Sequence, residues 1–312
     1  MFMTIMPFAC LTTGLVLGLL NMPNKFYSIS TIVTNVALVF LMVTIGANVG
    51  INDDVMSNLD TIGLNCILIC LLAISFSVFF CYIVEKKLIN FNEISKKLKK
   101  DEIKEQEKRS GIDPILIVIP FSILAGVGIG YYLIPSDYSN ILNNFLVTSL
   151  ILLYTSVGIG MGSNIGVFKF IKEIGFKIIY LVIAIYIGSA LGGAVASLIT
   201  GVPLKYAVIS ASGLGYYSLT GATMMQFYGA EAGVYGFMVN VMRDFFTVIL
   251  IPIFVRISPS APMASGAGGN MDTLLVPVTK AVGKELGGIA LVIGVVITLL
   301  VPIILPILCA VM

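Results

Sequence analysis

Apolar runs, each about as long as a membrane span, follow one another along most of this chain. A helix needs about 20 mainly apolar residues to cross the hydrocarbon core of a bilayer. Six runs meet that requirement: residues 4–22, 29–48, 62–83, 112–134, 141–160 and 174–199. Charged residues make up only 11% of the chain, whereas soluble proteins carry about 25%. The sequence therefore predicts an all-α integral membrane protein.

Half of the basic residues lie in one polar segment. Residues 85–113 hold nine of the 18 Lys and Arg residues and seven of the 16 Asp and Glu residues. Further lysines follow the first span and separate the fifth span from the sixth, whereas the opposite loops carry only aspartate. Because cytoplasmic loops are enriched in Lys and Arg, we expect the N-terminus outside and a cytoplasmic linker at 84–112. The alternating charges of this linker favour a solvated helix.

The chain contains no histidine, and its five cysteines lie inside apolar runs without a paired motif. Serine and cysteine nucleophile sites that use a histidine, His-ligated zinc and histidine proton relays are therefore excluded. We expect no catalytic residue, no metal and no cofactor, and hence a protein that is not an enzyme. A basic, aromatic-interleaved surface for nucleic acid is also missing. Any proton coupling must then use carboxylates.

A duplication relates residues 1–83 to residues 113–195 at a constant offset of 112. Glycines, a proline and an asparagine recur in register: Gly14 with Gly126, Gly18 with Gly130, Pro23 with Pro135, Gly46 with Gly158, Gly50 with Gly162, and Asn52 with Asn164. Each copy holds three spans, so the second copy enters the bilayer from the opposite side. Inverted repeats of this kind are typical of secondary transporters. We expect three-span repeats at 1–83 and 113–199.

A second, shorter duplication relates residues 203–256 to residues 259–311 within a transport core at 200–312. The sequence ASGLG at 211–215 recurs as ASGAG at 264–268. Each copy has a Gly/Ser-rich interrupted segment, at about 203–228 and 259–281, followed by a full span, at about 233–256 and 286–311. Such broken segments mark transporter binding sites. We predict two re-entrant hairpins and about eight transmembrane helices; the alternatives are two complete spans per copy or a single span through 203–228.

Very few ionisable residues remain at membrane depth. Arg243 and Asp244 lie near the middle of a span, and Asp272 follows the second glycine run. A charge at mid-bilayer is costly, so these residues are functional candidates, although Arg243 and Asp244 could instead form an ion pair that positions helices. Glu231 lies at a helix entry, where capping is the favoured role.

Three segments resemble signature segments of the LysO-type lysine exporter family. They are SGLGYYSLTG at 212–221, the group formed by Asn240, Arg243 and Asp244, and GGNMDTLLVPV at 268–278. The resemblance implies an inner-membrane protein that exports L-lysine and its analogue thialysine in exchange for protons. It also implies that two intramembrane acids matter, and these map onto Asp244 and Asp272. The family more often has Glu at the first position, and a serine where this chain has Asn270.

The residues and the resemblance agree on a cationic amino acid as substrate. Asp244, Asp272, Arg243, Asn240 and Asn270 are the candidates for substrate binding or proton coupling. Backbone N–H groups at the two glycine runs suit the substrate α-carboxylate; the residues concerned are Ser212, Gly213, Gly215, Ser265, Gly266 and Gly268. The expected partners are L-lysine, protons and the lipid bilayer, with a homodimer by analogy.

Three other functions stay open at this point. The first is a sodium-coupled transporter of an anionic amino acid or carboxylate, which hairpins with Ser/Gly tips would suit. The second is an intramembrane aspartyl protease that uses Asp244 and Asp272, although its usual GxGD motif is absent. The third is a passive channel, which is disfavoured because nothing in the sequence repeats around a pore axis.

Overall fold

The computed structural model describes residues 2–20, 23–88, 114–135, 138–163 and 177–312. Within these ranges every regular element is helical. Most of the linker predicted at 84–112 lies outside the described residues, although its first residues continue a helix as far as Leu88. The expected solvated helix of the linker also falls outside them.

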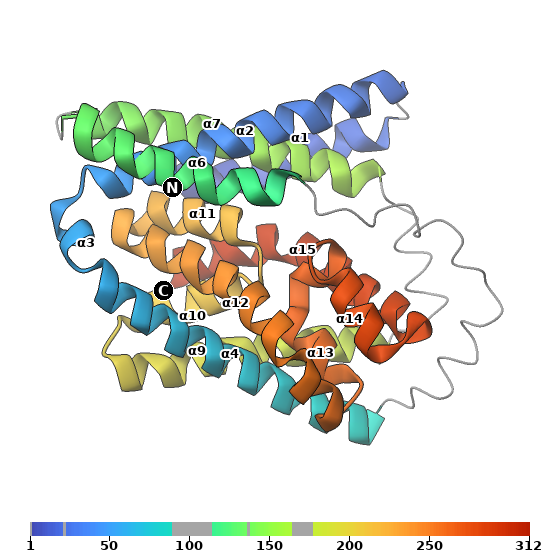
Figure 1. Ribbon diagram of the computed structural model, residues 1–312. Helices are drawn as coiled ribbons and strands as arrows, with labels where there is room; N and C mark the ends of the chain where they lie inside the picture. Colours follow the sequence, from blue (N-terminus) through green and yellow to red (C-terminus); the bar gives the residue numbers. More distant parts are fainter. Residues whose placement is uncertain (1, 21–22, 89–113, 136–137, 164–176) are drawn as a thin grey trace.

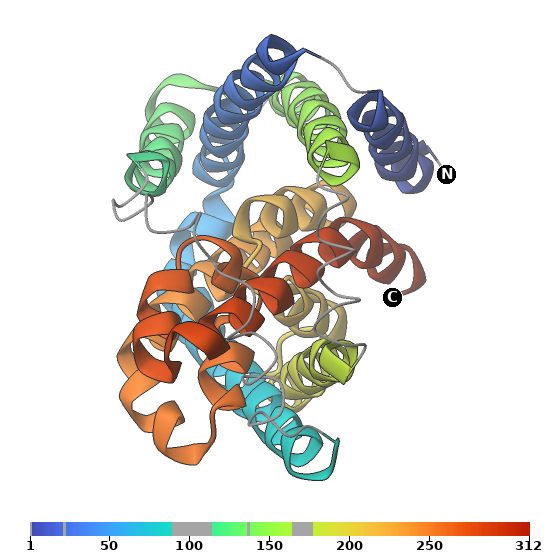
Figure 2. The same ribbon diagram turned by 90° about the vertical axis from the view of Figure 1, so that its right-hand side faces the viewer.

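Four helices form a layer of their own, at the top of Figure 1. They are α1 (Phe2–Leu19), α2 (Asn24–Gly50), α6 (Pro114–Leu133) and α7 (Ser139–Ser163). Within the layer α1 packs on α7, and α2 packs on α6 and α7. Figure 2 shows the same layer almost end-on, above the rest of the molecule.

Paired glycines explain the close approach of these helices. A Cβ atom added to Gly14 would lie 3.0 Å from Cα of Gly158, and one added to Gly46 would lie 3.0 Å from Cα of Gly126. The offset of 112 converts the first pair into the second. The glycines therefore recur in the sequence because the same helix contact is built twice, and small residues let the backbones meet.

The remaining helices form a second, larger group. The third helix of each repeat lies here: α4 (Leu59–Leu88) packs on α9 (Lys177–Thr200). A short helix, α3 (Asp53–Ser57), leads into α4. Each three-span repeat thus contributes its first two helices to one group and its third helix to the other.

The C-terminal part of the chain packs against α4 and α9. It consists of α10 (Leu204–Ser212), α11 (Tyr217–Tyr228), α12 (Ala230–Ile257), α13 (Ser260–Gly266), the 3-10 helix η2 (Ala267–Met271), α14 (Leu275–Val282) and α15 (Lys284–Val311). An offset of 54 converts the bounds of α12 into those of α15. Both ASGxG segments predicted to interrupt a helix do so, between α10 and α11 and between α13 and α14.

Six described helices are long and apolar enough to cross a membrane. Their apolar spans are Ile32–Gly50, Leu59–Leu88, Ile141–Gly160, Lys177–Thr200, Ala230–Ile257 and Leu286–Val311. Two further apolar helices are shorter over the residues searched, Ile5–Leu19 and Phe121–Leu133. The architecture is therefore that of an all-α, multi-pass membrane protein.

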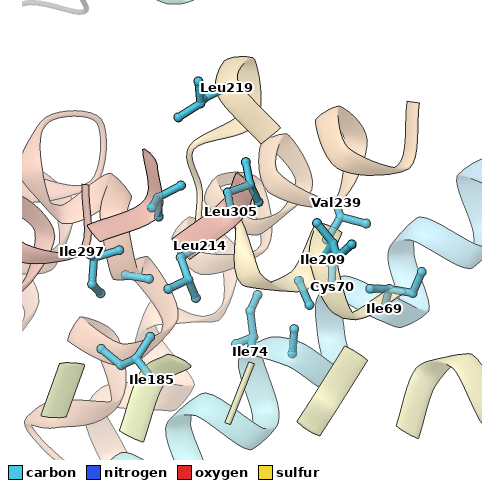
Figure 3. Close-up of a cluster of buried hydrophobic side chains, with 14 of the residues drawn as sticks. Ile69, Cys70, Ile74, Ile185, Ile209, Leu214, Leu219, Val239, Ile297 and Leu305 are labelled. Atoms are coloured by element: carbon cyan, nitrogen blue, oxygen red, sulfur yellow. The ribbon is translucent and has the colours of Figure 1, made fainter. Parts of the chain in front are cut away.

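One apolar core runs through the second group and continues into the four-helix layer. Figure 3 shows Ile74 of α4, Ile185 of α9 and Ile297 of α15 around Leu214, which belongs to the first helix break. Leu214 is fully buried. The break is therefore anchored by its own apolar side chain between the long helices.

Two single-residue turns connect α11 to α12 and α14 to α15. Gly229 has φ +92° and Gly283 has φ +93°, and a Cβ atom would meet nothing within 4 Å at either position. Replacing either glycine by alanine therefore tests backbone strain alone. We expect Gly229→Ala and Gly283→Ala each to lower the free energy of unfolding by about 1–3 kcal/mol, because side chains avoid this conformation.

Thermal and denaturant unfolding in detergent measure this cost. Gly128→Ala is the matched control, since Gly128 lies inside α6 and also has open space around its Cβ position. Alanine is favoured over glycine within a helix, so this variant should be as stable as the parent or more stable. Equal stability of all three variants would show that alanine at Gly229 and Gly283 causes no backbone strain.

Candidate substrate site at two helix breaks

The two helix breaks meet inside the second group. The N–H of Gly268 donates a hydrogen bond of 2.9 Å to the carbonyl of Leu214. A Cβ atom on Gly215 would lie only 3.4 Å from the nitrogen of Gly269. The backbone of one break is thus hydrogen-bonded directly to the backbone of the other.

Both breaks contain a non-glycine residue with positive φ. Leu214 has φ +52° and Ala267 has φ +45°, and these residues occupy equivalent positions in the duplication. Residues held in this region usually cost free energy and persist where the surrounding structure enforces them. The two breaks therefore share a positive φ at the same position of one sequence motif.

Three tyrosines bring the start of α10 close to the end of α11. The ring of Tyr206, near the start of α10, lies 5.9 Å from that of Tyr228, at the end of α11, and 6.1 Å from that of Tyr235. The chain therefore leaves this segment at the same end of the molecule at which it enters.

Asn240 holds the first break. Its Oδ1 accepts a hydrogen bond of 2.8 Å from the N–H of Gly215. Its Nδ2 donates to the carbonyls of Ser210, at 2.9 Å, and Gly236, at 2.7 Å. With a side chain that is 1% exposed, Asn240 satisfies the buried N–H of Gly215 within the break and connects the end of α10 to α12.

Arg243, one turn further along α12, holds the second break. Its guanidinium donates to the carbonyl of Ser265 at 3.0 Å and to that of Ala264 at 3.1 Å. These carbonyls lie at the C-terminal end of α13, where the helix dipole favours a positive charge. The sequence suggested substrate binding or proton coupling for Arg243, with a helix-positioning ion pair as the alternative; in this structure its guanidinium bonds to the backbone of α13.

Two serines complete the surroundings of Arg243. Its Nη1 donates to the hydroxyl of Ser189 at 2.9 Å, and its Nη2 donates to that of Ser77 at 3.3 Å. Ser77 of α4 and Ser189 of α9 are equivalent under the offset of 112, so the repeat places one copy of the same serine on each side of a single guanidinium. Sequence reasoning missed both serines, although the register of the duplication could have found them.

Asp244 lies where the two breaks meet. Its Oδ2 accepts a hydrogen bond of 3.0 Å from the hydroxyl of Thr273. Its Oδ1 is buried and has no hydrogen-bond partner among the described atoms. Cβ atoms on Gly215 and Gly269 would come within 3.3 Å and 2.8 Å of this oxygen. Asp244 therefore presents an unused acceptor to the point where the two glycine runs meet.

Asp272 is exposed and is connected to Asp244 through one residue. The N–H of Thr273 donates to Oδ1 of Asp272, while its hydroxyl donates to Asp244. The two acids predicted from the sequence are thus brought together. Thr273 is a further residue of the site, and sequence reasoning missed it because threonines are common in membrane helices.

Asn270 is fully buried in the second break. Its Nδ2 donates to the carbonyl of Met263 at 2.7 Å, whereas its Oδ1 has no hydrogen-bond partner among the described atoms. Asn270 therefore holds the end of α13 with its amide nitrogen and keeps one acceptor unused.

Most donors of the predicted carboxylate site are used within the protein in this conformation. The N–H groups of Gly213, Gly215 and Gly268 bond to Ser210, Asn240 and Leu214 respectively. The hydroxyls of Ser212 and Ser265 bond to carbonyls of their own helices. A substrate carboxylate would have to displace these internal partners, or the two breaks would have to separate.

Apolar helices that surround two interrupted segments, with buried polar side chains where these meet, define the class of multi-pass membrane transporters. The comparison with known families is more specific. The chain belongs to the lysine exporter LysO family, whose model matches residues 8–95 and 121–309.

Two relatives carry names that agree with this family. Lysine exporter LysO of Escherichia coli (strain K12) is 29% identical over 149 residues, which cover 48% of this chain and 50% of that protein. A Haemophilus influenzae protein named "Putative lysine exporter" is 26% identical over 177 residues, covering 56% of this chain and 88% of that protein. The match thus spans half the length of the Escherichia coli relative. No solved structure matches the chain significantly.

These findings separate the functions that the sequence left open. A family of exporters points away from an enzyme, and therefore from an intramembrane protease. The names of both relatives refer to lysine, so the sodium-coupled transport of an anionic substrate is not favoured.

Proposed function

We propose that this protein exports L-lysine, and analogues such as thialysine, from the cytoplasm by exchange for protons. Membership of the lysine exporter family supports the substrate. The observation that carries the mechanism is Asp244, a carboxylate with an unused oxygen at the contact between the two helix breaks. Because the chain has no histidine, Asp244 and Asp272 are the groups that exchange protons.

The proposal includes a topology. We infer eight membrane-crossing helices in the inner membrane, two re-entrant segments (α10–α11 and α13–α14), and an N-terminus outside. The proximity of Tyr206 and Tyr228 supports the first re-entrant segment. In the four-helix layer, the offset of 112 converts the contact of Gly14 with Gly158 into that of Gly126 with Gly46. This equivalence supports an inverted repeat. Lys86 and Lys87 at the end of α4 support a cytoplasmic linker at 84–112. A homodimer remains part of this proposal by analogy.

Charge balance explains why lysine and a proton exclude each other. Arg243 contributes one positive charge near the breaks, and Asp244 and Asp272 contribute two negative charges, so the empty site carries one net negative charge. Either one lysine cation or one proton neutralises it. Adding both would leave a net charge in a region of low dielectric, which is costly. We infer that the two compete and exchange one for one.

Substrate binding requires the two breaks to move apart. The N-terminal ends of α11 and α14 lie at the breaks and suit the α-carboxylate, once the bond between Gly268 and Leu214 opens. Asp244, Asp272 and the unused oxygen of Asn270 then suit ammonium groups. Arg243 and Asn240 keep the backbone of the half-helices in place while this happens.

Purified protein in liposomes that contain a pH-sensitive dye tests this function. A lysine gradient should drive protons in the opposite direction, independently of sodium and of a clamped membrane potential, because the exchange is electroneutral. Asp272→Asn should lose this coupling. Lysine flux that requires sodium, or normal coupling in Asp272→Asn, would contradict the proposal.

Thr273 offers a finer test, because its hydroxyl bonds to Asp244. Thr273→Val keeps the shape of the side chain but removes the donor. Hydrogen bonds to charged groups contribute about 1.5–3 kcal/mol, so we expect lysine exchange to fall about tenfold or more. Thr273→Ser keeps the hydroxyl and should stay close to the parent rate. Equal rates in both variants would show that the hydroxyl has no role in exchange.

A further inference from the structure

A cavity of about 320 Å³ opens away from the helix breaks, where α3 meets α4 and α9 turns into α10. Binding sites for small molecules usually have volumes of about 300–1,000 Å³. The lining residues come from α3, α4 and the residue between them, from α12, and from the end of α9 with the turn that follows: Val55, Asn58, Thr61, Ile62, Asn65, Thr200, Gly201, Val202, Pro203, Glu231 and Tyr235. None of these belongs to the site around Asp244.

The lining suits a primary ammonium group on an aliphatic stem. Glu231 provides the only charge among the lining residues. Asn65 offers an amide oxygen, and its Nδ2 donates to the hydroxyl of Tyr235 at 3.3 Å. Val55, Ile62 and Val202 are buried apolar residues. One carboxylate, neutral acceptors and an apolar wall therefore meet in one cavity.

A primary ammonium already lies at the edge of this region. The Nζ atom of Lys205 lies 4.5 Å from the ring centre of Tyr228 and 5.7 Å from that of Tyr206. The ring of Tyr206 in turn neighbours Tyr235, which lines the cavity. These aromatic faces attract cations, while the charge of Lys205 opposes tight binding of a second cation. The balance fits a site of modest affinity from which a cation leaves readily.

We propose that this cavity is a second binding site, specific for basic amino acids, in which Glu231 pairs with an ammonium group of the ligand. It would receive the substrate after release from the helix breaks, and in this respect it rests on the proposed function and orientation. The cavity lies at the end of the molecule where α10 begins and α11 ends, which the proposed topology places outside.

The absence of tryptophan from the chain makes a direct test available. Thr61→Trp places a single indole in the cavity, and Tyr180→Trp places one near the opposite end of α9 as a control. In detergent, L-lysine should change the emission of the Thr61→Trp protein but not that of the Tyr180→Trp protein. Norleucine, which lacks the side-chain ammonium, should have no effect.

Two further changes in the Thr61→Trp protein test the role of charge. Glu231→Gln should weaken lysine binding about tenfold or more, which corresponds to about 1.4 kcal/mol. Asn58→Asp should tighten binding several-fold. It adds a carboxylate with almost no change in the size of the side chain, and a folding defect would not produce tighter binding. An unresponsive indole, or the same affinity with and without Glu231, would overturn the proposal.

Asp244→Asn separates this proposal from the transport mechanism. In the Thr61→Trp protein it should leave lysine binding at the cavity unchanged. If L-lysine leaves the emission of the indole unchanged but is still exchanged for protons in an Asp244-dependent way, the second binding site in the cavity is wrong while lysine transport stands. If the indole reports lysine binding that depends on Glu231 but lysine moves no protons in liposomes, the second binding site in the cavity stands and the transport mechanism is wrong.

Discussion

Asp244→Asn should abolish proton-coupled lysine exchange while leaving the protein folded. The amide oxygen of asparagine can still accept the hydrogen bond from Thr273, so the surrounding structure keeps its contacts. The variant cannot take up and release a proton. Loss of a positioned proton-transfer group usually costs about a hundredfold or more, and we expect at least that reduction in lysine-driven proton flux into liposomes.

Asp60→Asn is the matched control for this change. Asp60 lies in the first turn of α4 and is exposed, away from both helix breaks. Its replacement should leave the flux within about twofold of the parent, as for most surface changes. Normal exchange in Asp244→Asn would remove this residue from the mechanism, and Asp272 would then be the remaining carboxylate at the breaks.

Arg243→Leu should have the largest effect on stability. Arg243 is 2% exposed, and its loss leaves the carbonyls of Ala264 and Ser265 buried without their donors. Each buried group that loses its partner costs about 1–3 kcal/mol, so we expect the free energy of unfolding to fall by about 3 kcal/mol or more. Chemical denaturation in detergent, with the folded fraction followed by size-exclusion chromatography, measures the loss.

Arg256→Leu is the control on the same helix. Arg256 lies in the last turn of α12 and is exposed, so its replacement should change stability by no more than about 0.5 kcal/mol. Arg243→Lys keeps the charge but cannot reach four acceptors on three helices, and its stability should lie between those of the parent and Arg243→Leu. A stable Arg243→Leu protein that fails to bind lysine would instead favour a direct role in substrate binding.

Much of the fold could be predicted because apolar length and repetition are explicit in the sequence. The spans predicted at 233–256 and 286–311 lie inside α12 and α15, and both ASGxG segments interrupt helices. The arrangement of the repeats could not be predicted. Helices that are apolar on all sides carry no pattern that identifies their neighbours, so nothing in the sequence indicated that α4 and α9 separate from the four-helix layer.

The sequence predicted which residues belong to the candidate site, but it did not distinguish residues that support the backbone from residues that could bind substrate or a proton. Rarity of charge singled out Arg243, Asp244 and Asp272, and the structure brings Asp244 and Asp272 together through Thr273. Sequence alone could not show that the donors of Arg243 and Asn240 are used by backbone carbonyls, because the carbonyls at the ends of α10 and α13 come within reach of these side chains only in the folded protein. The proposed proton and substrate roles of the acids stay predictions.

The turns at Gly229 and Gly283 also suggest an order in which the helices assemble. Each joins two helices that are neighbours in sequence, so α11–α12 and α14–α15 form from local contacts, which are the fastest to form. When α12 is complete, however, Ala264 and Ser265 have not yet been synthesised. Arg243 therefore lacks two of its acceptors until the second broken segment arrives, and we expect that segment to dock only after α11 and α12 have paired.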